Sequence, residues 1–343
     1  MRIELQDLNL PLMHRFAISR GGTDEVRTIW IRVIDEGVEG WGEAAAVKYK
    51  GQTRESMRAT LELISHRLAL TSVEKALKEW DSSEVHYPQE SGALAGLNMA
   101  LWDWKSKFEK RTLQSLWGTK GEWSPASSFT IGVDSPEVMS QKVIEAEQYP
   151  ILKVKLGFKG DLEVFELLQA IAPHKKWRID VNGGWGLEEA IEKSKALEKG
   201  GVELIEQPIT SSHPDDFRKI QEAISIPLYL DESVDGLEDL ERYRGAVQGV
   251  NLKLTKIGSL SGLKEATLQA KKWGYQVMYG CMTCSSLHIA GILPLSPLVD
   301  TLDLDGHLLL RREPFSGLVL NHEGAFRLTD QPGVGLEFDP RKL

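Results

Sequence analysis

Residues 151–158 read ILKVKLGF, a short apolar run that ends near a glycine and carries two lysines. A run of this length and composition is typical of a buried β-strand. Successive side chains of a strand point to opposite faces, so Lys153 and Lys155 lie on the same face. Because two neighbouring ammonium groups repel each other and resist burial, we expect this pair to have a chemical role.

Similar short runs recur along the chain and alternate with amphipathic helical patterns, which indicates a parallel sheet with right-handed crossovers. Together with 151–158 there are eight such runs, the number that closes a (β/α)-type barrel. An open doubly wound sheet is the alternative, although no G-x-G-x-x-G fingerprint follows any run. The other seven runs are SSFTIGV (127–133), KWRIDVNGG (176–184), GVELIEQPI (201–209), IPLYLDES (226–233), GVNLKLTK (249–256), YQVMYGCM (275–282) and LVDTLDLDG (298–306).

The part of the chain before these runs has a different pattern. From 1 to about 45 the residues alternate as in an antiparallel meander, and from about 53 to 117 they follow a helical period. We therefore expect an α+β capping domain over 1–122, completed by the Gly- and Pro-rich tail from about 312 to 343. The barrel then occupies 123–311.

Composition excludes several classes of function. The chain has 41 Lys+Arg against 50 Asp+Glu, a net charge of −9, which disfavours a nucleic-acid or anionic-membrane partner. No apolar run approaches the roughly 20 residues that span a bilayer, and the first residues lack the core of a signal peptide, so a cytoplasmic location is expected. The two cysteines, Cys281 and Cys284 in CMTC, are too few for a zinc site and follow a strand, which predicts reduced, structural thiols.

Three carboxylates end neighbouring runs. Asp180, Glu206 and Asp231 each follow an apolar run directly, at intervals of about one βα unit. One such acid alone is more often a surface residue or a helix N-cap. In a barrel, however, all three face the common mouth at the carboxyl ends of the strands, where they repel one another unless a cation joins them. Hard oxygen ligands of this kind predict a Mg²⁺ site.

Two lysines flank this group of acids. Lys155 precedes the three acidic strands and Lys253 lies on the strand that follows them. Two bases on opposite sides of a bound substrate can remove a proton from one face of a carbon and return one to the other. Such a lysine needs a lowered pKa, and we expect Lys153 to lower the pKa of Lys155 and to hold a substrate carboxylate. Two lysines on a solvated edge strand are the alternative.

Asp303 and Asp305 in TLDLDG lie two residues apart on the last run and therefore share a face. Since three other acids already provide for a metal, this pair suits a cationic group, most simply a substrate ammonium. The alternatives are an additional metal shell, or structural pairing with a nearby lysine or arginine.

These motifs make the chain similar to the muconate-lactonising branch of the enolase superfamily, and most closely to its dipeptide epimerases. The resemblance implies a (β/α)7β modified TIM barrel with an N-terminal α+β capping domain. It also implies Mg²⁺ on Asp180, Glu206 and Asp231, an acid/base pair in Lys155 and Lys253, and an α-ammonium on Asp303 and Asp305. The motifs are KVK (153–155), DVNGGW (180–185), EQP (206–208), DES (231–233), NLKLTKIG (251–258) and DLD (303–305).

The resemblance also suggests substrate contacts outside the shared motifs. Arg20 in FAISRGG (16–22) is expected to face an acidic side chain of the substrate, with a solvated surface position as the alternative. Thr130, on the first barrel strand, is a further candidate. Relatives commonly carry a glutamate on the seventh strand, where this chain has Cys284, and Cys284 is therefore also a candidate for substrate contact. Lys256 is expected to contact neighbouring carboxylates.

The implied activity is that of an isomerase. Its reaction is Mg²⁺-dependent 1,1-proton transfer at the α-carbon of the C-terminal residue of an Ala-containing dipeptide, such as L-Ala-D/L-Glu or Ala-Ala. A β-elimination of the o-succinylbenzoate synthase or cycloisomerase type is the alternative on the same scaffold. A non-catalytic metal and amino-acid binder is the alternative from another class. Barrels of this type often assemble, so a homo-oligomer is compatible with the sequence.

Overall fold

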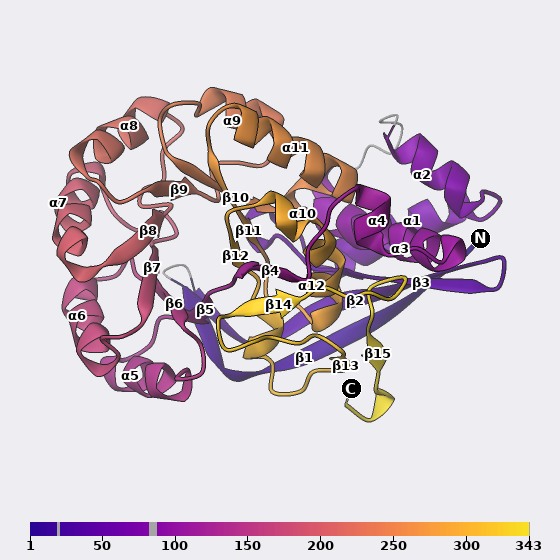
Figure 1. The fold of residues 1–343 in the computed structure, drawn as a ribbon, viewed down its shortest axis with the longest axis horizontal. Helices are drawn as coiled ribbons and strands as arrows, with labels where there is room; N and C mark the ends of the chain where they lie inside the picture. Colours follow the sequence, from indigo (N-terminus) through magenta and orange to yellow (C-terminus); the bar gives the residue numbers. More distant parts are fainter. Residues whose placement is uncertain (19–20, 82–87, 343) are drawn as a thin grey trace.

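The computed structural model describes residues 1–18, 21–81 and 88–342. Its larger part is an eight-stranded sheet whose strands are parallel and follow one another in chain order (Figure 1). A parallel bridge between Ser127 and Leu302 joins the two ends of the sheet, so it closes into a barrel and the open doubly wound alternative is wrong. The strands are β5 (Phe129–Ile131), β6 (Ile151–Lys155), β7 (Lys176–Asp180), β8 (Val202–Glu206), β9 (Leu228–Leu230), β10 (Gly249–Lys253), β11 (Gln276–Gly280) and β12 (Thr301–Asp303).

Helices connect the successive strands and cover the outside of the barrel (Figure 1). After β12 the described chain has no further α-helix, only the 3₁₀ turns η5 (Gly306–Leu309) and η6 (Pro340–Lys342) and short strands of the tail, so the predicted (β/α)7β barrel is confirmed. The connecting elements are α5 (Pro136–Glu145), α6 (Asp161–Ile171), α7 (Leu187–Leu197) with η3 (Glu198–Gly200), α8 (Pro214–Ala223), α9 (Leu237–Arg242), α10 (Leu254–Ile257), α11 (Leu260–Lys272), and α12 (Ser286–Ile292) with η4 (Leu293–Leu298).

The N-terminal part is the expected α+β unit, an antiparallel sheet of three strands covered by helices. Its central contact is unusually close, because a Cβ atom added at Gly42 would lie 2.0 Å from the carbonyl oxygen of Gly96. Only glycines at this crossing allow the longest helix to lie directly on the third strand. The elements are β1 (Arg2–Ile18), β2 (Gly21–Asp35), β3 (Val38–Ala44), η1 (Lys48–Lys50), α1 (Arg54–Leu68), α2 (Val73–Asp81), η2 (Pro88–Glu90), α3 (Ser91–Glu109) and α4 (Leu113–Trp117).

The C-terminal tail contacts both parts. Strand β14 (Ala325–Arg327) pairs with β4 (Trp123–Ala126) below the barrel, and β13 (Phe315–Ser316) pairs with β15 (Glu337–Phe338). The ring of Trp30 on β2 lies 5.3 Å from that of Phe315 and 4.4 Å from that of Phe338, measured between centroids. Aromatic packing therefore attaches the tail to the N-terminal sheet.

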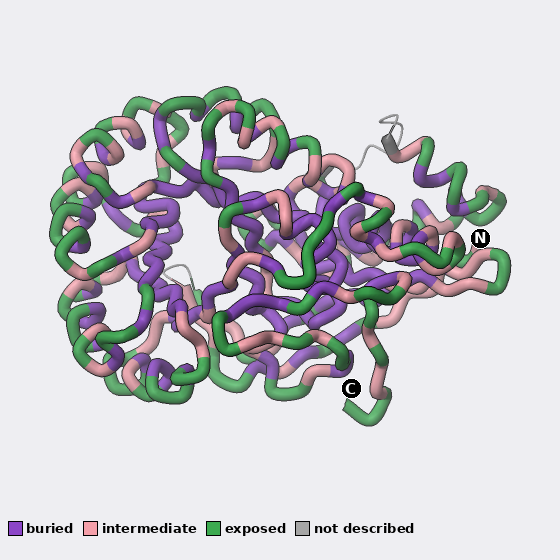
Figure 2. The backbone as a smooth tube through the Cα atoms, viewed as in Figure 1, coloured by how far each residue is buried: buried purple, intermediate pink, exposed green. Residues whose placement is uncertain are grey.

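Burial follows the layers of the fold. The barrel strands are buried along their length, whereas the outward faces of the surrounding helices are exposed (Figure 2). One apolar core fills the barrel and the space under its helices, and a second lies between the N-terminal sheet and its helices. None of the helices in the described ranges combines the length and apolar composition needed to cross a bilayer.

Candidate active site

Three buried carboxylates lie side by side at the carboxyl ends of the barrel strands. Asp180 ends β7 and stands in register with Glu206, which ends β8. Asp231 follows β9 directly, and its charge acts on both of the other two carboxyl groups. All three side chains are buried. Since the strands are parallel, their ends share one mouth, and the acids converge there as expected from the sequence.

The Lys153 ammonium lies at the centre of this group. Its Nζ is 2.6 Å from Oδ2 of Asp303, 2.7 Å from Oε2 of Glu206 and 2.9 Å from Oδ2 of Asp180. Burial lowers the pKa of Lys153, but the three carboxylates outweigh this and hold it well above its usual range. Lys153 is therefore the fixed positive charge of the site.

Lys155 and Lys253 lie at opposite ends of the row of acids. Nζ of Lys155, on β6, donates to Oδ2 of Asp180 at 2.6 Å. Nζ of Lys253, on β10, donates to Oδ2 of Asp231 at 2.6 Å. Lys256 donates to the other Asp231 oxygen at 2.8 Å, which is the carboxylate contact expected for it.

The lowered pKa that a lysine base needs is not found at Lys253 in this arrangement. Burial lowers its pKa, but Asp231 and Glu206 raise it above its usual range. From the sequence we considered only the repulsion between ammonium groups. In the structure, carboxylates lie nearer to Lys253 than the other ammonium groups do.

The acids differ in how well their charge is compensated. The lysines lower the pKa of Asp180 to about 2 and that of Asp231 below its usual range, although burial acts against them. Burial and the neighbouring Asp180, by contrast, raise the pKa of Glu206 to about 8. Over the described ranges, no three acidic, histidine or cysteine side chains are arranged to hold an ion as they now stand, because ammonium groups occupy their oxygens.

Asp303 and Asp305 have different partners. Asp303 binds Lys153 through Oδ2 and accepts a hydrogen bond from the Ser128 hydroxyl at 2.7 Å. Oδ2 of Asp305 accepts the backbone N–H of Thr130 at 2.6 Å, and burial with the nearby Asp303 raises its pKa to about 6. The pairing of Asp303 with a lysine is one of the alternatives considered from the sequence, and no ion pair to Asp305 occurs among the described residues.

The remaining candidates fall in different places. Arg20 lies outside the described residues. Thr130 is buried beside Asp305 and contributes its backbone N–H. Cys284 is also buried, and a Cβ at Gly306 would lie 3.1 Å from its Sγ, so the thiol packs behind the Asp305–Gly306 segment. The two cysteines form no disulfide.

Several polar residues of the site had not been singled out from the sequence. Asn251 donates to Oε1 of Glu206 at 2.9 Å, and its position two residues before Lys253 on one strand could have indicated this face. The backbone N–H of Asn182 donates to Oδ1 of Asp180 at 3.0 Å. Nothing in the sequence marked Ser128 as a site residue, because Asp303, which accepts its hydrogen bond, is distant in the sequence.

The N-terminal domain also reaches the mouth. Glu43, at the end of β3, accepts the backbone N–H of Ser285 at 3.1 Å and its hydroxyl at 2.5 Å. Lys50 forms an ion pair of 2.8 Å with Asp235, in the loop that follows Asp231. The loops after β11 and β9 are therefore positioned by the N-terminal domain.

Comparison with known proteins gives matches over nearly the whole chain. Residues 3–118 match the mandelate racemase/muconate lactonizing enzyme N-terminal domain, and residues 138–342 match the enolase C-terminal domain-like family. An L-Ala-D/L-amino acid epimerase of Flavobacterium johnsoniae is 33% identical, with 98% of this chain and 99% of the relative covered.

Two solved structures superpose closely. The dipeptide epimerase of Cytophaga hutchinsonii, complexed with Mg and D-Ala-L-Val, has a TM-score of 0.91 at 24% identity and covers 98% of this chain and 95% of its own. That of Methylococcus capsulatus, complexed with Mg and L-Arg-D-Lys, has a TM-score of 0.89 at 27% identity, with 98% and 99% covered.

Proposed function

Since the chain belongs to the mandelate racemase/muconate lactonizing enzyme family of the enolase superfamily, we propose that it is a dipeptide epimerase. The proposed reaction inverts the α-carbon of the C-terminal residue of an Ala-containing dipeptide. The observation that carries the proposal is the placement of Lys155 and Lys253 at opposite ends of one row of acids. The 33% identical relative is an epimerase of the same kind.

The residues at the mouth fit a Mg²⁺ ion. Asp180, Glu206 and Asp231 offer carboxylate oxygens, which this ion prefers. Burial and the charges of Asp180 and Asp231 raise the pKa of Glu206, an effect that a bound cation would oppose. When bound, Mg²⁺ would supply positive charge beside the substrate carboxylate. The same ion is present with dipeptide in the Methylococcus capsulatus enzyme.

Each remaining step is assigned to side chains of this chain. Lys153 orients the carboxylate whose charge increases as the α-proton leaves, and preorganised positive charge of this kind is commonly the largest catalytic contribution. One of Lys155 and Lys253 removes the proton and the other delivers one to the opposite face. Asp303 and Asp305 hold the α-ammonium. Glu43 holds the loop after β11, which packs against Gly306 next to Asp305.

The test is proton exchange at the α-carbon. We expect that, with Mg²⁺ in D₂O, Ala-containing dipeptides incorporate deuterium at Cα of the C-terminal residue and racemise there, while the o-succinylbenzoate precursor is not dehydrated. A library of C-terminal residues, read by mass spectrometry, will separate L-Ala-Glu from hydrophobic dipeptides. Dehydration without exchange would support β-elimination instead. A cytoplasmic location and a homo-oligomer remain predictions of the sequence.

A second prediction concerns recognition of the ammonium group. We expect Asp305→Asn to raise KM for L-Ala-L-Glu about 10- to 100-fold, since a hydrogen bond to a charged group contributes about 1.5–3 kcal/mol. N-propanoyl-L-glutamate lacks the ammonium, so its KM should change little. Asp300→Asn, at the start of β12 away from the mouth, is the matched control. Equal losses with both substrates would instead mean that Asp305 serves only the structure around Thr130.

A further inference from the structure

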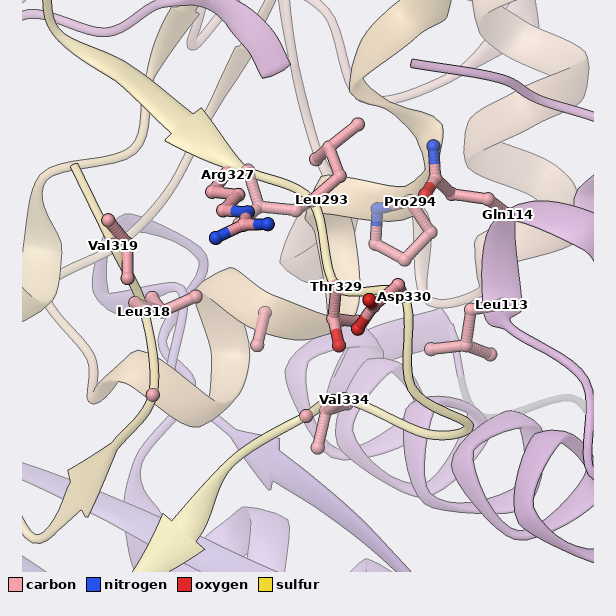
Figure 3. A pocket seen from close by; sticks show the side chains of 14 residues that line it. Leu113, Gln114, Leu293, Pro294, Leu318, Val319, Arg327, Thr329, Asp330 and Val334 are labelled. Atoms are coloured by element: carbon pink, nitrogen blue, oxygen red, sulfur yellow. The ribbon is translucent and has the colours of Figure 1, made fainter. Parts of the chain in front are cut away.

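A cavity of about 320 Å³ lies at the junction of the N-terminal domain, the barrel and the C-terminal tail (Figure 3). Helix α12 runs from the mouth end of β11 towards the start of β12, and the cavity adjoins its last turn. The cavity is therefore on the side of the barrel opposite the row of acids. Among the lining residues are Leu113, Leu293, Pro294, Leu318, Val319 and Leu328.

The cavity combines apolar and polar wall segments with one cation, Arg327, whose side chain is exposed. The Arg327 guanidinium, on β14, points into the space between these walls (Figure 3). No hydrogen bond or ion pair to this guanidinium occurs in the described part of the chain. Asp330, the other charged lining residue, accepts a hydrogen bond from Gln331 at 3.0 Å and forms no ion pair with Arg327.

We propose that this cavity binds a small carboxylate with a branched apolar body, anchored by Arg327. A planar guanidinium matches a carboxylate through two parallel hydrogen bonds, which makes arginine the usual partner for this group. The cavity volume is within the range of small-molecule sites, and such sites favour domain junctions. Apolar walls beside the guanidinium select a ligand with an alkyl chain over a free inorganic anion.

The test uses 4-methylpentanoate as probe and saturation-transfer NMR of its methyl signals, with Mg²⁺ and a saturating dipeptide present to occupy the barrel mouth. We expect transfer in the wild type that falls at least fivefold in Arg327→Gln. The same loss is expected in Val319→Trp, because Val319 is half exposed at the cavity and a larger ring there fills it. Arg312→Gln, an exposed arginine outside the cavity, is the matched control and should keep full transfer.

Three results would overturn the proposal. One is unchanged transfer in both Arg327→Gln and Val319→Trp. Another is equal transfer to the neutral 4-methylpentanamide, which would mean that the cation is not used. The third is complete loss of the signal when dipeptide is added, which would place the probe at the barrel mouth. Thermal melting of Arg327→Gln within a degree of the wild type shows that lost binding is not lost folding.

Discussion

Replacing Lys155 by methionine is expected to lower kcat for epimerisation by about 10²- to 10⁴-fold, the usual contribution of a positioned acid or base. Lys253→Met should do the same, because inversion needs a proton donor on one face and an acceptor on the other. The structure separates the two lysines by the row of acids, with Lys155 on Asp180 and Lys253 on Asp231. The rate of epimerisation should therefore fall in each variant, whichever stereoisomer of the C-terminal residue is supplied.

The sharper measurement follows proton exchange for each isomer separately. With one lysine left, the enzyme can still exchange the α-proton that faces this lysine, without inverting the carbon. We expect Lys155→Met and Lys253→Met to exchange opposite C-terminal stereoisomers in D₂O. Lys159→Met, an exposed lysine just after β6, is the control and should keep full activity. Exchange of the same isomer by both variants would contradict the two-base arrangement.

The second large effect concerns stability. Asp231→Asn removes the carboxylate shared by the buried Lys253 and Lys256 ammonium groups. Leaving one member of a buried ion pair without its partner costs about 3–5 kcal/mol of unfolding free energy. For a chain of 343 residues we expect a drop in melting temperature of roughly 4–7 °C. Differential scanning fluorimetry without added metal measures it.

Two companion variants locate the cause of this loss. Asp215→Asn removes an exposed carboxylate that pairs with Arg218, and such pairs contribute about 0–1 kcal/mol. Its melting temperature should stay near that of the wild type. Adding Lys256→Met to Asp231→Asn removes one uncompensated charge and should restore part of the stability. A melting temperature for Asp231→Asn equal to that of Asp215→Asn would show that water reaches these lysines and compensates them.

The sequence predicted the fold well because the barrel repeats one local pattern. Eight short apolar runs, each followed by a turn and most by a helix, suffice to indicate the strands, and the closing bridge from Ser127 to Leu302 follows from their number. The positions of Asp180, Glu206 and Asp231 were equally readable, because parallel strands bring their carboxyl ends to one edge.

Contacts between distant segments could not be predicted in this way. Glu43 binds Ser285 from another domain, and no local pattern marks either residue as a partner of the other. The direction in which the pKa of Lys253 shifts could not be predicted for a related reason. The pKa of Lys253 depends on whether the Asp231 and Glu206 carboxylates or the other ammonium groups lie nearer to it. These distances between strands cannot be read from the spacing of residues along the chain. The close packing of Cys284 against Gly306 is likewise a contact between separate segments.

In the described part of the chain, seven helical connections join the eight barrel strands, and the N-terminal domain supplies part of the cover where an eighth would stand. Leu12 on β1 bridges to Leu310, and the next residue, Arg311, donates its backbone N–H to the carbonyl of Pro11 at 2.8 Å. These contacts fasten β1 to the segment that leaves Asp303 and Asp305. A new N-terminal half would therefore also have to cover this side of the barrel. Recombination among relatives is expected to transmit both halves together.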